Sequence, residues 1–128
     1  MLEAEQHPSG WVEARMLRVS LAFLLLCGCS SGPQSDLQYI KQARSLGAEW
    51  ALVNEQADKG KLTPTYVSSM HAWLRDQLQT TSASLTMPDS RYAAEIEAMA
   101  KLPDDAAPEE LRARAERLSQ IEDELESA

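Results

Sequence analysis

Trp50, Asn54, His71 and Trp73 are the side chains of this chain with the clearest potential for binding or chemistry. A histidine can act as a general base or bind a metal ion, but each role needs a nucleophile or further ligands that the fold positions nearby. No nucleophile motif and no phosphate-binding glycine loop accompanies His71. We therefore expect no catalytic residue, no metal site and no cofactor. We interpret His71, which adjoins Met70 in the sequence, as a residue at the edge of the core.

Trp50 and Asn54 belong to the most distinctive segment, W-A-L-V-N-E-Q. One interpretation is a polar hydrogen-bonding patch beside an aromatic hot spot for a partner protein. The other is that Trp50 belongs to the core and that Asn54 forms a hydrogen bond across a helical hairpin. Aromatic residues at helical spacing usually pack inward, which favours the second interpretation. Together with His71 and Trp73, these two residues remain possible partner-binding residues.

The two cysteines form a C-x-C pair, Cys27 and Cys29. A metal site with four ligands would need further cysteines or histidines nearby, and the sequence offers none close to the pair. The pair instead follows Arg18 and an uncharged apolar run, V-S-L-A-F-L-L-L, at positions 19–26. A positive residue, a short apolar run and small residues after it are typical of a secretory signal. The run is too short for a transmembrane helix, which needs about 20 apolar residues.

Leu26, Cys27, Gly28 and Cys29 resemble the lipobox of bacterial lipoproteins. In that class a leucine stands three positions before an invariant cysteine, and a small residue directly precedes the cysteine. Cys27 departs from the usual alanine, serine or threonine at its position. The resemblance implies that Cys29 receives a diacylglycerol and becomes the first residue of the mature protein. It covers residues 16–29 only, and it implies nothing about the domain that follows.

We predict four segments in the chain. Residues 1–15 contain three glutamates, which are unusual at the start of a signal peptide. We therefore interpret Met16 as the true start and residues 1–15 as a non-native or disordered extension. The remaining predicted segments are a signal peptide at 16–28, the lipidated cysteine with a polar tether at 29–34, and a periplasmic domain at 35–128.

Helical periodicity and helix-end signals run through the predicted domain. We expect an all-α fold: a small bundle built on an antiparallel helical hairpin, with a short third helix and a C-terminal amphipathic helix. The expected boundaries are a capping box at Ser35 with Gln38, a left-handed Gly60, an N-cap at Thr63 before Pro64, a stop at Pro88, a cap at Asp89 or Ser90, and a start at Pro108.

The turn between the first two helices also predicts a register for the hairpin. Its centre lies near position 61.5, so we expect residue i to lie opposite residue 123 minus i. This register places Trp50 opposite Trp73 and Val53 opposite Met70, with both tryptophans in the core. The packing rule behind it is that large apolar residues should meet other apolar residues.

Twenty acidic residues against twelve Lys and Arg give the chain a net charge of -8, which argues against a nucleic-acid partner. We expect a small lipid-anchored cell-envelope protein on the periplasmic face. The residue after Cys29 is Ser30 and not an aspartate, which resembles the outer-membrane sorting signal of lipoproteins in enteric-type bacteria, so the resemblance implies the outer membrane before the inner one. The expected role is a non-catalytic binding or scaffolding module for an unknown envelope protein. The alternative is an immunity or inhibitor-type lipoprotein that occludes a toxin or an envelope enzyme.

Two structural features should separate these roles. An exposed apolar or aromatic patch on the hairpin would favour the scaffold. A compact domain that presents mainly its acidic C-terminal helix would favour electrostatic capture of a basic target.

Overall fold

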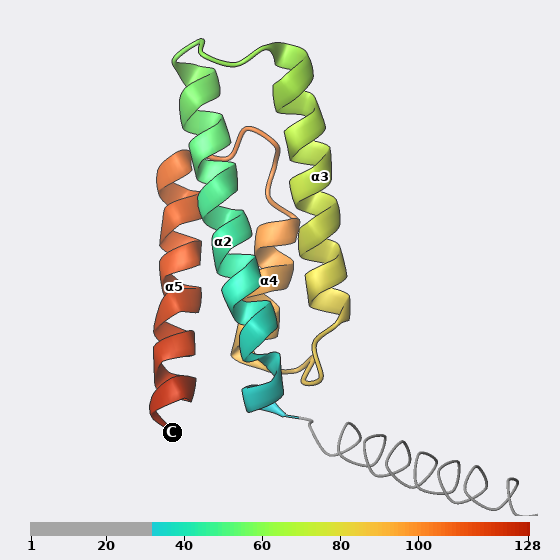
Figure 1. Ribbon diagram of the computed structural model, residues 1–128, viewed down its shortest axis with the longest axis vertical. Helices are drawn as coiled ribbons and strands as arrows, with labels where there is room; N and C mark the ends of the chain where they lie inside the picture. The colour runs from blue at the N-terminus through green and yellow to red at the C-terminus, as the bar shows by residue number, and fades with distance from the viewer. Residues whose placement is uncertain (1–31) are drawn as a thin grey trace, which may run out of the picture. The chain divides into compact units, whose positions relative to one another are not determined.

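The computed structural model describes residues 32–128, which form four α-helices and no strand (Figure 1). The helices are α2 (Pro33–Asp58), α3 (Pro64–Ala83), α4 (Arg91–Ala100) and α5 (Pro108–Ser127). This confirms the expected all-α fold with a hairpin, a short third helix and a C-terminal helix. None of the helices in residues 32–128 is long and apolar enough to cross a membrane.

Helix α2 begins two residues earlier than we expected. Gly32 is its N-cap, with φ 119°, and Pro33 is its first residue. Proline suits this position because its fixed φ is helical and its missing N–H would have no partner there. The predicted capping box is therefore wrong: the hydroxyl of Ser35 donates to the carbonyl of Gly32 at 2.9 Å. The end of the predicted tether consequently belongs to the helix.

Helix α3 ends at Ala83, five residues before the stop that we expected at Pro88, whereas other helix ends follow their local signals. Gly60 has φ 70°, the left-handed conformation that glycine adopts without strain. The Thr63 side chain accepts a hydrogen bond from the backbone N–H of Tyr66, and Ser90 caps α4 in the same way. Helix α5 begins at Pro108 as expected.

Helix α2 lies at the centre of the bundle, with α5 along one side and α3 along the other (Figure 1). At Gly47 the neighbouring elements approach so closely that a Cβ atom would lie 2.8 Å from the sulfur of Met99. The largest fully buried apolar side chains of this core are Ile40, Trp50, Leu74, Leu78, Ile96, Met99, Leu111 and Leu118.

Helix α5 docks on the bundle as an amphipathic helix. Its buried residues are Leu111, Ala115, Leu118, Ile121 and Glu122. Ion pairs flank this apolar stripe, including Arg112 with Glu55 of α2 at 2.7 Å. Exposed pairs of this kind contribute little each, so the apolar stripe carries most of the docking energy.

The predicted pairing of Trp50 with Trp73 is wrong. Trp50 is fully buried, whereas 47% of Trp73 is exposed. The contacts across the hairpin join Asn54 to His71, and Trp50 to Arg75, so the residue numbers sum to 125 instead of 123. The rotation of α3 explains the difference. Its buried residues are His71, Leu74, Leu78 and Thr81, and each residue turns the helix by about 100°, which carries Trp73 away from this stripe.

Candidate functional site

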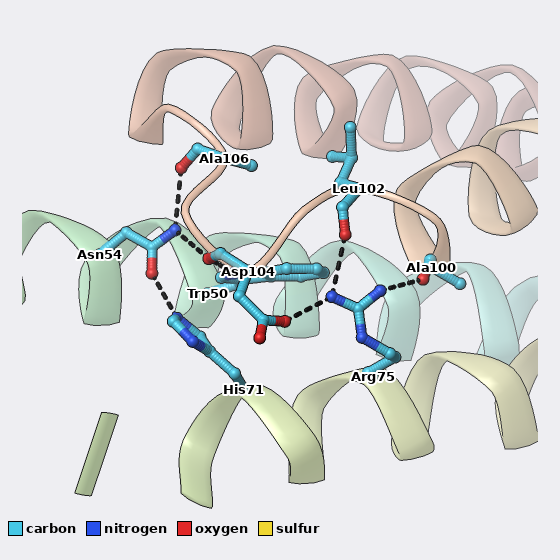
Figure 2. A network of polar contacts seen from close by, with 8 residues as sticks. All are labelled: Trp50, Asn54, His71, Arg75, Ala100, Leu102, Asp104 and Ala106. Carbon is cyan, nitrogen blue, oxygen red and sulfur yellow. Dashed lines mark hydrogen bonds and ion pairs between the residues drawn. The ribbon is translucent and has the colours of Figure 1, made fainter. Parts of the chain in front are cut away.

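Three of the four candidate binding residues meet in one buried network (Figure 2). The exposed fractions of Trp50, Asn54 and His71 are 0%, 5% and 9%. Trp50, Asn54 and Arg75 donate to carbonyls of the segment 100–106, which ends α4 and leads into α5, and His71 joins them through Asn54. We call Trp50, Asn54, His71 and Arg75 the polar hub.

The amide of Asn54 is the centre of the polar hub. Its nitrogen donates to the carbonyls of Asp104 at 3.0 Å and Ala106 at 2.8 Å. These two carbonyls fix the orientation of the amide, because only its NH₂ group can donate to them. The amide oxygen therefore faces Nε2 of His71 at 2.7 Å, and we assign the ring proton to Nε2 from this network. His71 thus donates a hydrogen bond across the hairpin.

Trp50 and Arg75 complete the hub, and both bond to Asp104. The indole N–H of Trp50 donates to the carbonyl of Asp104 at 3.1 Å. The guanidinium of Arg75 lies over the indole, 5.3 Å from the ring centre, which is a cation–π distance. The same guanidinium donates to the carbonyls of Ala100 and Leu102 and to the carboxylate of Asp104, the last at 2.5 Å.

The polar hub holds the α4–α5 connection against the hairpin. Four carbonyls of this connection find donors there, which satisfies backbone groups that would otherwise be costly to bury. The hub confirms the interpretation of Trp50 as a core residue, of Asn54 as a bond across the hairpin and of His71 as a residue at the edge of the core. The hub has a structural role, because its donors already bond to groups of the chain itself.

Sequence reasoning missed a second buried cluster, which is centred on Asp36 near the start of α2. The Asp36 carboxylate is fully buried and accepts hydrogen bonds from the backbone N–H groups of Thr86 and Met87. It also accepts from the hydroxyls of Thr86 at 3.0 Å and Tyr92 at 2.6 Å. The signal was present in the sequence: Asp36 lies four residues before Ile40, on the apolar stripe of its helix.

The Asp36 cluster shifts two pKa values in opposite directions. Burial alone would raise the pKa of Asp36, but the donors of Tyr92, Thr86 and Met87 stabilise the carboxylate and hold its pKa below 3.8. Burial and the neighbouring carboxylate together raise the pKa of Tyr92 to about 12. Asp36 is therefore ionised, and Tyr92 protonated, throughout the neutral range.

Trp73 lies apart from the buried network, on the outer side of α3. It shares that side with Tyr66, which is 49% exposed, and with the partly exposed Met70. Residues separated by four and seven positions lie on one face of a helix. We call Tyr66, Met70 and Trp73 the aromatic face.

A separate surface hollow of about 430 Å³ lies between α4 and α5. Its apolar floor is formed by Ala94, Ala98 and Ile121, and charged side chains surround it. Within residues 32–128, no three histidine, cysteine or carboxylate side chains are grouped to hold a metal ion.

The predicted lipidation site lies outside the described residues. This applies to Cys29, to the other lipobox residues Leu26, Cys27 and Gly28, and to the predicted extension and signal peptide at 1–15 and 16–28.

Comparison with known proteins gives no relative from which a role can be carried over. No family model matches the chain, and no curated protein and no solved structure matches it significantly.

We predict that Asn54→Ala strongly destabilises the fold. The change leaves the Ala106 carbonyl and the buried N–H of His71 without their partner and removes one of the two donors to the Asp104 carbonyl; each unpaired group costs about 1–3 kcal/mol. We expect a loss of about 3 kcal/mol in the free energy of unfolding, measured by urea denaturation with circular dichroism. Gln56→Ala on the same helix is the matched control and should cost far less. Equal losses would contradict the role of the hub.

We predict that Asp36 makes the fold sensitive to acid. Because folding lowers the pKa of Asp36, its contribution is present above the unfolded pKa of about 3.9 and is lost as the pH falls through the folded pKa. The stability gap between the parent and Asp36→Asn should therefore be largest near neutral pH and shrink below about pH 4. Urea midpoints at pH 7 and pH 3 measure this gap. Asp76→Asn, at an exposed position, is the control, and a constant gap for Asp36→Asn would refute the prediction.

Proposed function

We propose that this protein is a lipid-anchored binding or scaffolding module of the cell envelope, and that it contacts its partner protein through the aromatic face of α3. The single observation that carries the proposal is the exposure of Tyr66 and Trp73, each about half exposed on the hairpin. Tryptophan and tyrosine are the residues most enriched in interface hot spots.

The charge pattern of α3 supports this assignment. Only Arg75 and Asp76 among its 20 residues are charged, and Arg75 is turned into the polar hub. Helix α5 has the same length, but ten of its residues are charged. Interface centres are depleted of charge and enriched in aromatic residues and methionine, which describes the outer side of α3 and not that of α5.

The non-catalytic part of the proposal rests on how the titratable side chains near the hub are used. His71 donates to Asn54, and the Asp104 carboxylate accepts from Arg75. Each group thus has a structural partner, and neither faces a nucleophile among the hub residues. Binding through a surface is the activity that the arrangement favours.

The anchoring part of the proposal rests on the lipobox resemblance at Cys29. A diacylglycerol meets the requirement that stable anchoring takes at least two acyl chains, because each buried CH₂ contributes about 0.8 kcal/mol. Helix α2 begins at Pro33, so the domain follows the proposed lipid site closely in the sequence.

The immunity or inhibitor role remains a second candidate because of one observation on α5. Glu109, Glu116 and Asp123 are exposed at intervals of seven residues, and none forms an ion pair within residues 32–128. An unpaired acidic row of this kind suits a basic target.

We predict that Trp73→Ala releases the partner and leaves the domain folded. Hot-spot truncations cost 2 kcal/mol or more in binding, so recovery of the partner should fall at least tenfold. The measurement is capture of the tagged full chain from detergent-solubilised envelopes, with quantitative mass spectrometry. Leu52→Ala, which removes an exposed apolar side chain from α2, is the control and should not change recovery.

The same experiment separates the two candidate roles. If the acidic row is the contact, Trp73→Ala leaves recovery unchanged and Glu116→Lys abolishes it. Thermal melting followed by circular dichroism checks that each variant is folded. Equal recovery with Trp73→Ala and Leu52→Ala refutes the aromatic face as the binding surface.

We predict that Cys29→Ser blocks processing. In the proposed pathway the cysteine sulfur receives the lipid before cleavage, so the variant should accumulate as the uncleaved precursor. Immunoblotting and intact-mass measurement of envelope fractions test this. Normal cleavage and release of the variant as a soluble protein would show that the chain is not a lipoprotein.

A further inference from the structure

The end of the bundle that contains the start of α2 is closely tied to the α3–α4 loop, residues 84–90. The N–H of Gly32 donates to the hydroxyl of Thr86 at 3.1 Å, and that hydroxyl lies 3.3 Å from the Gly32 carbonyl. Asp36 accepts from Thr86 and Met87 in the same loop. The first described residue of the chain is therefore held beside this loop.

The α3–α4 loop exposes an apolar side chain, Met87, whose own backbone N–H and carbonyl are both paired. Residues 84–88 read S-L-T-M-P and carry no charge, and Met87 is 39% exposed. The N–H of Met87 donates to Asp36, while its carbonyl accepts from the N–H and the hydroxyl of Ser90. Backbone groups that are already paired can approach a poorly hydrated surface at low cost. The loop is suited to contact with lipid.

The length of chain before the described residues limits where such a lipid surface can lie. Cys29 precedes Gly32 by three residues, and three residues span at most about 11 Å. Helix α2 contains 26 residues and is therefore about 39 Å long. A lipid on Cys29 can reach the end of the bundle with the α3–α4 loop, whereas the α2–α3 turn at Lys61 lies several times farther away.

We propose that the α3–α4 loop, through Met87, is the surface on which the domain stands against a lipid bilayer. This inference rests on the proposed lipid anchor at Cys29, because the anchor supplies the affinity and the loop sets the orientation. The domain then stands upright, with α2 directed away from the bilayer. The aromatic face of α3 points sideways, toward partners held in or near the same membrane.

The charged residues near the α3–α4 loop indicate whether the bilayer carries a net charge. Lys41 and Arg91, the basic residues closest to this end of the bundle along the helices, are paired with Glu126 and Glu124. Asp89 in the loop is exposed. Anionic lipids therefore find no unpaired cation near the loop, and the proposed surface is zwitterionic. Contact through Met87 should not weaken when salt is added, because it is apolar.

The test uses the lipidated protein and places a fluorescent probe at one end of its helical bundle or at the other. In the processed and lipidated protein no free native thiol is left, so Met87→Cys or Lys61→Cys provides a single labelling site. Each variant is labelled with nitrobenzoxadiazole and reconstituted into phosphatidylcholine vesicles that contain brominated phosphatidylcholine as the quencher. We expect at least twofold stronger quenching and a blue-shifted emission at position 87 relative to position 61, unchanged in 0.5 M salt.

A second set of variants keeps the test independent of the labelled side chain. With the probe at Ser84→Cys, the added change Met87→Asp should remove the blue shift, because it places a charge at the lipid contact. Leu52→Asp, an equivalent change at an exposed apolar residue of α2, should leave it intact.

The outcomes distinguish this inference from the anchor itself. If the vesicles retain the protein but neither position is quenched, or both are quenched equally, the upright contact is refuted and the anchor stands. If the native chain takes up the thiol dye and does not float with vesicles, the anchor itself is refuted.

Discussion

The hydrogen bonds of the Asn54 side-chain amide are the interaction on which the end of the bundle near the α2–α3 turn depends. The amide joins α2 to α3 through His71, and it joins both helices to the α4–α5 connection through two carbonyls. Both amide hydrogens and the amide oxygen are used, so removing the side chain breaks the bonds of α2 to α3 and to the α4–α5 connection at once. In a poorly hydrated interior, hydrogen bonds that share one residue strengthen each other and fail together.

Helix α2 uses the same face to hold both ends of α4. Asp36 and Asn54 are separated by 18 residues, which is five helical turns, so both side chains leave the same side of the helix. Asp36 binds the segment that enters α4, and Asn54 binds the segment that leaves it. A helix of ten residues is marginal alone. Its position therefore depends on two fixed connections as well as on its own apolar contacts.

Four helix ends could be predicted from the sequence because they depend on local signals, whereas the start of α2 and the end of α3 could not. Gly60, Thr63, Ser90 and Pro108 each act on the backbone within a few residues. The lipobox prediction at Cys29 lies outside the described residues and stays a prediction.

The hub and the Asp36 cluster could not be fully predicted, since their partners are mainly backbone carbonyls and N–H groups. Such groups occur in every residue, so nothing in the letters at positions 104, 106 or 87 identifies them as partners. The register of the hairpin failed for a related reason. The centre of a turn does not determine how far α3 rotates about its axis, and Leu74 and Leu78, which are larger contributors to the core than the turn, determine that rotation.

The polar side chains of the interior are already paired within the fold, so a partner would have to bind to the surface. Asn54, His71, Asp36 and Tyr92 all have hydrogen-bond partners within the fold, so a ligand would have to break a structural bond to engage them. Several charged side chains of α5 form ion pairs with residues of α2 and α4. The aromatic face of α3 has no such partners: Tyr66 and Trp73 are about half exposed, and Asp76 is the one exposed charged residue of the helix. Association there requires the desolvation of few charges, which is why we propose the aromatic face, and not the more distinctive buried residues, as the surface for a protein partner.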